Sequence, residues 1–273
     1  MKKTILITGA SRGFGKLWAK TFLQRGDKVA ATARKLADLD DLSEEFGELF
    51  TPIQLDVNDR AATFEAVKSA NAALGSIDVL INNAGFGLFG TIEEATEEEA
   101  RQQFETNVFG LLWVTQAVLP LMRNQGHGHI IQVSSALGLT AIPTLGLYSA
   151  SKFAVEAIGE SLSAEVAGFG IKVTLVEPNG FETDWAGASA VQSKPMGVYE
   201  EVRMAAQNSV KPGDYGDPLA TSPALLALVD SKNPPLRLFL GKVAYPWIKS
   251  VYENRLAIWE DWKEISAAAH GAQ

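Results

Sequence analysis

The sequence of 273 residues contains no cysteine. That absence excludes disulfide bonds and thiolate metal sites, and it is typical of a reducing compartment, so we expect a cytoplasmic protein. Long apolar runs are also missing, because the first one, Ile5–Ile7, stops at Thr8 and Gly9. The sequence therefore predicts no membrane span, no secretory leader and no membrane partner.

Positive charge is scarce as well, since 24 Lys and Arg stand against 32 Asp and Glu and give a formal net charge of -8. A nucleic-acid partner is not expected, because it requires a clustered basic surface that releases counterions. His127 and His129 stand in a glycine-containing turn without carboxylate or cysteine companions, so no metal site is predicted. The composition favours a small-molecule partner.

Hydrophobic residues make up 47% of the chain, which is enough for a large core. Short, β-branched apolar runs alternate with helical patterns, as in a parallel sheet that is covered by helices on both faces. We predict an α/β fold, a doubly wound Rossmann-type parallel sheet of about seven strands. The runs are Thr4–Thr8, Lys28–Thr32, Pro52–Val57, Val79–Ile81, His129–Val133, Lys172–Val176 and Leu236–Leu240.

No linker, repeat or low-complexity tract divides the chain, so residues 1–273 are predicted to form a single domain. Glycines and prolines interrupt the strand-helix rhythm over residues 180–217, and we expect a substrate lid there. A C-terminal helical extension is predicted over residues 243–270. Its apolar stripe is expected to pack on the fold or on a second subunit of a homodimer or homotetramer; the stripe consists of Ile248, Val251, Tyr252, Leu256, Trp259 and Trp262.

A glycine-rich turn follows the first strand and opens into a helix. Glycines allow a tight turn and a close approach of the backbone to a ligand, and the free amides of the helix N-terminus then face a pyrophosphate. The turn reads Thr8-Gly9-Ala10-Ser11-Arg12-Gly13-Phe14-Gly15. The small residues of Asn82-Asn83-Ala84-Gly85 follow the fourth strand and suit the passage of a flat ligand. Both patterns predict a dinucleotide site.

Three further side chains suggest proton-transfer chemistry. Ser135 closes the fifth predicted strand, and Tyr148 and Lys152 lie four residues apart at the start of a helix, hence on one face. The pKa of a tyrosine, about 10, is too high for a base at neutral pH, and a nearby ammonium favours the phenolate. We therefore expect Tyr148 to transfer a proton and Lys152 to lower its pKa.

These motifs, over residues 1–185, resemble the short-chain dehydrogenase/reductase family. The resemblance implies that Ser135 binds the substrate oxygen, that Tyr148 exchanges its proton, and that Lys152 also binds the nicotinamide ribose. It further implies Asn107 as a fourth catalytic residue, which links Lys152 to water. The implied cofactor-binding residues are Gly9, Ser11, Arg12, Gly13, Phe14, Gly15, Arg34, Asp56, Val57, Asn83, Ala84, Gly85, Tyr148, Lys152, Pro178, Gly180 and Thr183. Asn179 departs from the family's usual glycine.

The cofactor preference is read from the end of the second strand. The acidic residue that accepts hydrogen bonds from the adenosine ribose would align with Ala33 and is missing, whereas Arg34 follows and Arg12 lies in the glycine turn. We expect NADP(H) to be preferred, with NAD(H) possible, in a carbonyl reductase or alcohol dehydrogenase for a hydrophobic ketone or secondary alcohol. The alternatives are an NAD-dependent hydroxysteroid- or retinol-like dehydrogenase working oxidatively, an epimerase-type relative, and a non-catalytic dinucleotide sensor.

Overall fold

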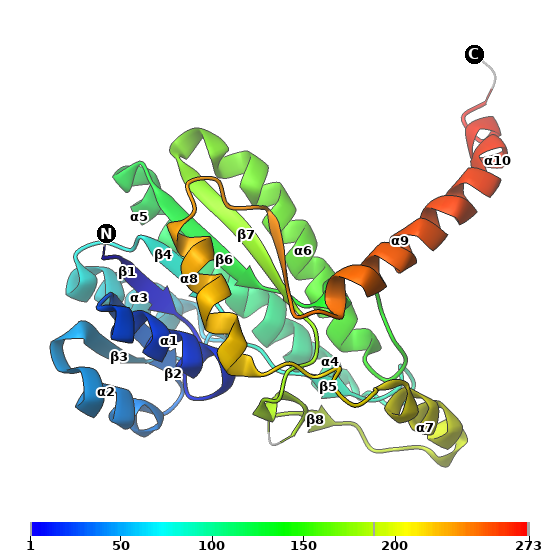
Figure 1. Cartoon of the computed structure of the whole chain (residues 1–273), viewed down its shortest axis with the longest axis horizontal. Coiled ribbons are helices and arrows are strands. Elements are labelled where there is room, and N and C mark those ends of the chain that lie inside the picture. The colour runs from blue at the N-terminus through cyan, green and yellow to red at the C-terminus, as the bar shows by residue number, and fades with distance from the viewer. Residues whose placement is uncertain (1, 188, 272–273) are drawn as a thin grey trace.

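The computed structural model describes residues 2–187 and 189–271. At its centre lies a seven-stranded sheet in the order β3-β2-β1-β4-β6-β7-β9, in which every neighbouring pair is parallel (Figure 1). The order reverses between β1 and β4, as in a doubly wound Rossmann sheet. The strands are β1 Thr4–Ile7, β2 Lys28–Ala33, β3 Phe50–Gln54, β4 Val79–Asn82, β6 Gly128–Val133, β7 Ile171–Pro178 and β9 Arg237–Leu240.

All seven predicted strands are present, and the predicted fold class is confirmed. The third strand was placed too far along the chain, because β3 spans Phe50–Gln54 and not Pro52–Val57. Leu55 and Val57 are buried, as their apolar character requires, but their side chains join the helix-facing core beyond the strand end. Leu55 and Val57 are thus buried without belonging to the strand, which explains why the predicted strand ended too late.

Helices cover both faces of the sheet (Figure 1). One face contacts α1 Gly13–Arg25, α2 Asp40–Phe46 and α8 Ser222–Asp230, and the other contacts α3 Arg60–Leu74, α5 Leu111–Gln125 and α6 Gly146–Val166. The helix predicted after the glycine turn ends at Gly26, whose left-handed backbone caps α1. The short turns are η1 Leu36–Leu39, η2 Gly47–Leu49, η4 Ala136–Gly138, η5 Ala167–Phe169, η6 Asp184–Ala186, η7 Gly197–Tyr199 and η8 Pro218–Thr221.

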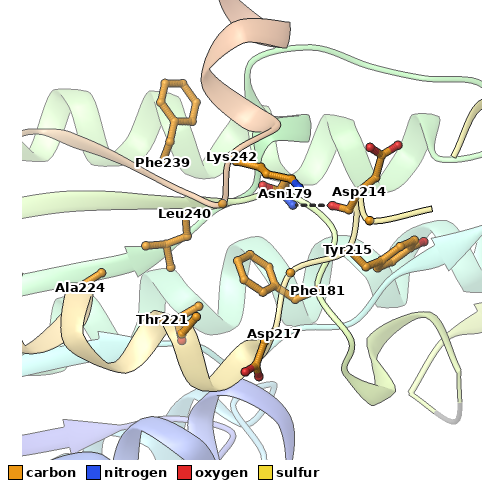
Figure 2. A pocket seen from close by; sticks show the side chains of 14 residues that line it. Asn179, Phe181, Asp214, Tyr215, Asp217, Thr221, Ala224, Phe239, Leu240 and Lys242 are labelled. Atoms are coloured by element: carbon orange, nitrogen blue, oxygen red, sulfur yellow. Dashed lines mark hydrogen bonds between the residues drawn. The ribbon is translucent and has the colours of Figure 1, made fainter. Parts of the chain in front are cut away.

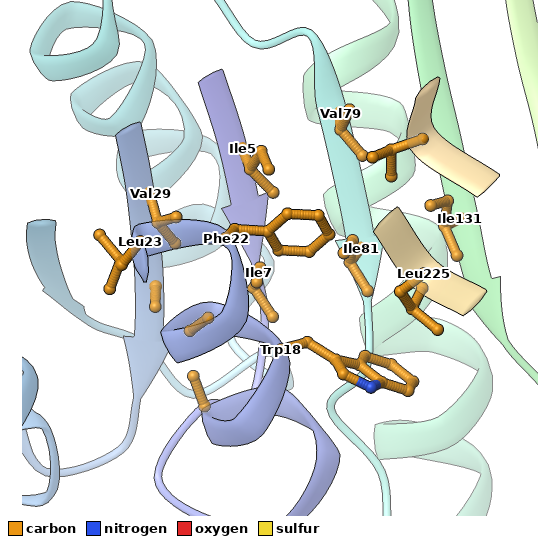
Figure 3. Close-up of a cluster of buried hydrophobic side chains, with 14 of the residues drawn as sticks. Ile5, Ile7, Trp18, Phe22, Leu23, Val29, Val79, Ile81, Ile131 and Leu225 are labelled. Atoms are coloured by element: carbon orange, nitrogen blue, oxygen red, sulfur yellow. The ribbon is translucent and has the colours of Figure 1, made fainter. Parts of the chain in front are cut away.

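The core follows the two-residue period of the strands. Ile5 and Ile7 point to the α1 side, and Leu6 points to the α3 side, so that adjacent side chains fill different layers. Figure 3 shows Trp18 and Phe22 of α1 seated on the first of these layers. The Trp18 Nε1 donates a hydrogen bond of 2.8 Å to Thr221 Oγ1, which satisfies the one polar atom of this buried side chain.

A capping box at Thr96 begins α4, Glu97–Phe104. Beyond it the helix widens into a π-helical segment, η3 Glu105–Gly110, before α5 starts. Nothing in the periodicity of the sequence indicates this widening. Single π turns inside α-helices are frequent at functional sites, and this one carries Asn107.

The C-terminal extension forms α9 Ala244–Asp261 and α10 Lys263–Ala268, which point away from the body (Figure 1). Ile248 is buried, whereas Leu256 and Trp259 are 58% and 62% exposed. The prediction that the stripe packs on the fold therefore holds only for the start of α9, because the rest of the helix leaves the sheet. Among the described residues, no helix is long and apolar enough to cross a membrane.

Candidate active site

A cavity of about 1390 Å³ opens at the C-terminal ends of the strands. It extends from the glycine turn to the segment between β7 and α8, which holds β8 Val191–Gln192 and α7 Glu200–Ser209. Typical small-molecule pockets occupy about 300 to 1,000 Å³. The cavity is therefore large enough for a dinucleotide and a second molecule.

The glycine turn packs tightly against the end of β4. Gly9 has a φ of +69°, and a Cβ built on it would lie 2.7 Å from the Ala84 Cα. A Cβ on Gly15 would lie 2.4 Å from the Gly9 carbonyl oxygen. Neither position accepts a side chain without displacing backbone, so the predicted glycine requirement has a steric cause.

Asn83 holds this turn in place. Its Nδ2 donates to the carbonyl oxygens of Thr8 and Gly9 at 3.0 and 2.9 Å. Thr8 Oγ1 in turn accepts hydrogen bonds of 3.1 Å from the amides of Asn83 and Ala84. Asn83, Ala84 and Gly85 all line the cavity, and the Asn83 side chain serves as a brace between β1 and β4.

The cavity offers donors for phosphate groups at the start of α1. Arg12 occupies the N-cap position with no side-chain cap, so that the first amides of the helix are free to bind an anion. Ser11, Gly13 and Phe14 line the cavity beside it. Arg12 and Arg34 are exposed cavity residues, and neither guanidinium forms an ion pair with a described carboxylate. These donors suit the negative charges of a dinucleotide.

Asp56 and Val57 line the same cavity, together with Ala33 and Leu55. The Asp56 carboxylate accepts a hydrogen bond of 3.1 Å from the Asn58 amide. The chain therefore forms a tight turn directly beyond β3, and that turn closes one side of the cavity.

Ser135, Tyr148 and Lys152 converge in the middle of the cavity, and they are 8%, 5% and 6% exposed. Ser135 does not close the strand as predicted, because β6 ends at Val133 and Ser135 caps the turn η4 by accepting from the Leu137 amide at 3.1 Å. Tyr148 and Lys152 share one face of α6, and the Lys152 Nζ lies 5.8 Å from the centre of the tyrosine ring. That amine donates to the Val133 carbonyl oxygen at 2.7 Å.

Burial is the main cause of the pKa shifts of both Tyr148 and Lys152. For Tyr148 the shift is upward: burial raises its pKa to about 12, against which a hydrogen bond from Ser135 acts. The expected lowering of this pKa by Lys152 is thus not found. Burial instead lowers the pKa of Lys152 itself to about 8, while the charge of Glu156 acts in the opposite direction.

Asn107 lies beside these residues on the π-helical segment. Its Oδ1 accepts from the Phe86 amide, and its Nδ2 donates to the Phe86 carbonyl oxygen, both at 3.0 Å. A Cβ on Gly85 would lie 3.0 Å from Asn107 Oδ1 and 3.8 Å from Lys152 Nζ, so both side chains border the same point. The π-helical segment carries Asn107, whose Nδ2 also lies 3.1 Å from Ser151 Oγ on α6.

The end of β7 supplies Pro178, Gly180 and Thr183 to the cavity. Asn179 does not have a positive φ, so its position does not require a glycine. Among the described non-glycine residues, only Thr144 has a positive φ. Figure 2 shows the Asn179 amide donating to the Asp214 carbonyl oxygen, at 3.2 Å. Asn179 therefore ties the strand end to the far side of the lid segment, beside a smaller cavity of about 400 Å³.

The predicted lid residues divide into two groups. Trp185, Val191 and Val202 line the cavity. Met196, Val198 and Met204 are 38%, 75% and 53% exposed and are not among the residues that line it. On α7, the face toward the cavity carries residues at helical spacing from Val202. That face continues through Ala205, Ala206 and Ser209. Ala188 lies outside the described residues.

The cavity residues that the sequence did not indicate include Val243, the N-cap of α9, and Trp247 in its first turn. They are spaced four residues apart, and this spacing could have indicated a shared helical face. The predicted stripe includes Val251, one turn further along this face, but it begins at Ile248 and omits Val243 and Trp247. Within the described part of the chain, no group of three or more His, Cys, Asp or Glu side chains is arranged to hold a metal ion.

Residues 3–193 match the family model described as short chain dehydrogenase. Oxidoreductase BOA17 of Botryotinia fuckeliana is 39% identical over 98% of this chain and 100% of its own length. The 3-ketodihydrosphingosine reductase of Bacteroides thetaiotaomicron is 40% identical over 87% of both chains. The chain therefore belongs to the short-chain dehydrogenase/reductase family, as the motifs indicated, and is an oxidoreductase acting on CH-OH or C=O groups with NAD(P).

Solved structures agree with this assignment. A short-chain dehydrogenase from Streptomyces avermitilis superposes with a TM-score of 0.92 at 36% identity, over 98% of both chains. A short chain dehydrogenase from Burkholderia cenocepacia in complex with NADP gives 0.76 at 27% identity, over 95% of this chain and 97% of that one. A 3-ketoacyl-(acyl-carrier-protein) reductase from Brucella melitensis complexed with NADH gives a TM-score of 0.76 at 26% identity, over 87% of this chain and 96% of that one.

Proposed function

We propose that this protein is an NADP(H)-dependent carbonyl reductase or alcohol dehydrogenase that interconverts a hydrophobic ketone and its secondary alcohol. The observation that carries this proposal is the convergence of Ser135, Tyr148 and Lys152 inside one cavity that begins at the glycine turn. A proton donor and a dinucleotide site within one enclosure are what hydride transfer to a carbonyl requires.

In this proposal the bound cofactor supplies or accepts the hydride. The Ser135 hydroxyl binds the substrate oxygen, and the Tyr148 hydroxyl gives it a proton in reduction or removes one in oxidation. Lys152 holds positive charge near the phenol and binds the nicotinamide ribose, and Asn107 completes the path from Lys152 toward solvent. Because the pKa of Tyr148 is high in the protein without ligands, its phenol is protonated at neutral pH and can act as a proton donor.

The proposed cofactor residues fall into three groups along the cavity. The glycine turn and Arg34 would hold the phosphates and the adenosine, Asp56 and Val57 would border the adenine, and the ends of β4 and β7 would border the nicotinamide half. The exposed guanidiniums of Arg12 and Arg34, which pair with no carboxylate in the described part of the chain, support NADP(H) over NAD(H). The NADP in the Burkholderia structure also supports it, whereas the Brucella structure holds NADH.

The substrate half of the cavity supports an apolar ligand. Its walls come from η4, the following loop, the lid segment and α9. The name of the Bacteroides relative, 3-ketodihydrosphingosine reductase, agrees with a long apolar ketone. The cavity-facing apolar residues are Leu137, Ile142, Leu145, Trp185, Val191, Val202, Val210, Val243 and Trp247.

The direct test is a panel of ketones, aldehydes and secondary alcohols, each assayed in both directions with NADP(H) and NAD(H). Faster reduction of bulky apolar ketones with NADPH supports the proposal. Oxidation with NAD as the preferred cofactor favours the hydroxysteroid- or retinol-like alternative. Cofactor binding without turnover of any class would indicate a sensor and overturn the proposal.

We also propose that the chain is one domain with a lid over residues 180–217, and that it forms a cytoplasmic homodimer or homotetramer. The exposed side chains of Tyr252, Leu256 and Trp259 support an oligomer, because burying apolar area against a second subunit stabilises it by about 25 cal/mol per Å². Light scattering of the purified protein tests the assembly, and a monomeric mass would contradict it.

A further inference from the structure

A buried acidic pair lies one helical turn beyond Lys152. Tyr148, Lys152 and Glu156 follow each other at four-residue intervals on one face of α6. Glu156 is only 4% exposed, and Glu177 of β7 is fully buried. Ionisable side chains are rarely buried this completely unless they are paired. No step of the proposed reaction uses these two carboxyl groups.

Arg237 of β9 joins the pair from the neighbouring strand. Its Nε donates to Glu156 Oε2 at 2.9 Å and lies 3.5 Å from Glu177 Oε1. Its Nη2 donates to Glu160 Oε2 at 2.5 Å, on the exposed side of the same helix. One guanidinium therefore connects α6, β7 and β9 below the site.

One guanidinium cannot neutralise all of this acid. Glu156 Oε1 and both Glu177 oxygens have no hydrogen-bond partner among the described residues. Two ionised carboxylates in contact inside a protein repel strongly, so such pairs retain a proton. Burial and the neighbouring Glu156 raise the pKa of Glu177 to about 8. At neutral pH the pair therefore carries one negative charge.

Glu156 lies one helical turn from Lys152 on α6, and its charge favours the ammonium form of the Lys152 amine. A Cβ on Gly138 of η4 would lie 2.9 Å from Glu156 Cγ and 3.2 Å from the Lys152 carbonyl oxygen, so the glycine leaves these two residues closely packed. The groups that face Lys152 are the Tyr148 phenol and Glu156 of α6, the Val133 carbonyl of β6 and the uncharged Asn107. Arg237 and Glu160 face the pair.

We propose that the Glu156–Glu177 pair, clamped by Arg237, is a positioning element that keeps the Lys152 amine protonated in its buried site. Burial alone favours the neutral amine, and an adjacent anion favours the ammonium. With the retained proton, the pair, Arg237 and Glu160 together carry one net negative charge, which matches the single charge of Lys152. The inference rests on the proposed function, in which the Lys152 ammonium assists Tyr148.

The first test titrates Lys152 directly by NMR in protein labelled with ¹³C,¹⁵N-lysine, with Lys152→Met to assign the signal. Glu156→Gln removes the adjacent charge at constant size, and we expect the titration midpoint to fall by at least about 0.5 pH unit. Glu160→Gln is the control, because it removes an exposed partner of Arg237 and leaves the pair intact. An unchanged midpoint in Glu156→Gln would overturn the inference.

The Lys152 titration in Glu177→Gln is an independent test of the pairing, and it remains available if Glu156→Gln does not fold. The new amide can donate to the Glu156 carboxylate and fix the charge there, so the Lys152 midpoint should stay or rise. A lowered midpoint in this variant would contradict the pairing.

The second readout is the pH profile of kcat, whose alkaline limb should move with the NMR midpoint. A purely structural role would lower kcat or Tm without moving this limb, and that result would overturn the inference. If wild-type protein turns over no carbonyl or alcohol, the proposed function fails, while the NMR result still decides the pairing.

Discussion

The indole of Trp185 packs on the ring of Tyr148, with the ring centres 4.8 Å apart and the planes inclined by 57°. Trp185 belongs to η6 of the lid segment, and its other neighbour is Phe89 of β5 Leu88–Phe89, at 5.3 Å. The strand β5 pairs with β8, so the lid is attached to the body on both sides of the indole. The tryptophan thus forms a wall directly beside the proposed proton donor.

Replacing this wall should impair the use of large substrates. We expect Trp185→Ala to lower kcat/KM for bulky apolar ketones by about tenfold or more, since a buried aromatic side chain contributes about 1.5 to 3 kcal/mol. Reduction of a small ketone such as acetone should change less. Trp113→Ala is the matched control, because Trp113 stacks on Phe109 and does not line the cavity. An equal loss of kcat/KM for the bulky and the small ketone would contradict the proposal that Trp185 forms a wall of the substrate site.

The cofactor preference should depend on Arg12 and Arg34. Two charge-assisted hydrogen bonds of about 1.5 to 3 kcal/mol each predict that kcat/KM is at least about tenfold higher with NADPH than with NADH. The double variant Arg12→Ala/Arg34→Ala should lose this ratio. Lys35→Ala should retain it, because Lys35 is exposed and does not line the cavity. A wild-type ratio of one, or an unchanged ratio in the double variant, would disprove this assignment.

Glu94 anchors the lid segment. Its side chain is 1% exposed, accepts from the Thr91 and Met196 amides at 2.8 and 2.7 Å, and pairs with Arg203 of α7. These contacts lower the pKa of Glu94 to about 2. We expect Glu94→Gln to speed proteolytic cleavage between residues 196 and 210, whereas Glu97→Gln, which breaks an exposed pair with Arg101, should not.

The same protease assay examines closure of the lid. NADP together with a bound alcohol should slow cleavage of wild-type protein in this segment, because a closed lid hides its backbone. Equal cleavage rates with and without these ligands would leave the lid without support.

His129 should make the protein sensitive to mild acid. Its Nε2 lies 3.0 Å from Thr174 Oγ1, and burial, with the charges of Lys172 and Lys3, lowers its pKa to about 4. The unfolded chain binds the proton near the ordinary value of 6.5, so stability is complete above that pH and is lost as the pH falls toward 4.

We expect this residue to account for about 2 to 3 kcal/mol of the free energy of unfolding lost between pH 7.5 and 4.5. Urea titrations at the two pH values measure it. His129→Gln should remove that part of the loss, and His127→Gln, at an exposed position, should not. A loss in His129→Gln equal to that of the wild type would refute the assignment.

Local chemistry made much of the site predictable. The glycine turn could be placed because its glycines stand directly between a strand and a helix in the sequence. The contact of Gly9 with Ala84, which joins two distant segments, could not be predicted. Tyr148 and Lys152 could be placed on one face because four residues make about one helical turn. The seven strands followed from their β-branched runs.

Contacts between distant segments were not predictable in this way. Arg237 meets Glu156 across 81 positions, and Glu94 meets Arg203 across 109. No period or motif relates such residues, because only the folded chain brings them together. The high pKa of Tyr148 has the same origin, since its burial depends on the packing of the lid and not on the neighbouring Lys152.

The most direct measurement is NADPH-dependent ketone reduction by Tyr148→Phe beside wild type, with cofactor affinity measured on both proteins. The substitution removes one hydroxyl and keeps the ring that contacts Trp185. We predict that turnover falls by at least about a hundredfold, the usual contribution of general acid catalysis, while the Kd for NADPH stays nearly unchanged. Retention of more than about a tenth of wild-type turnover would contradict Tyr148 as the proton-transfer group.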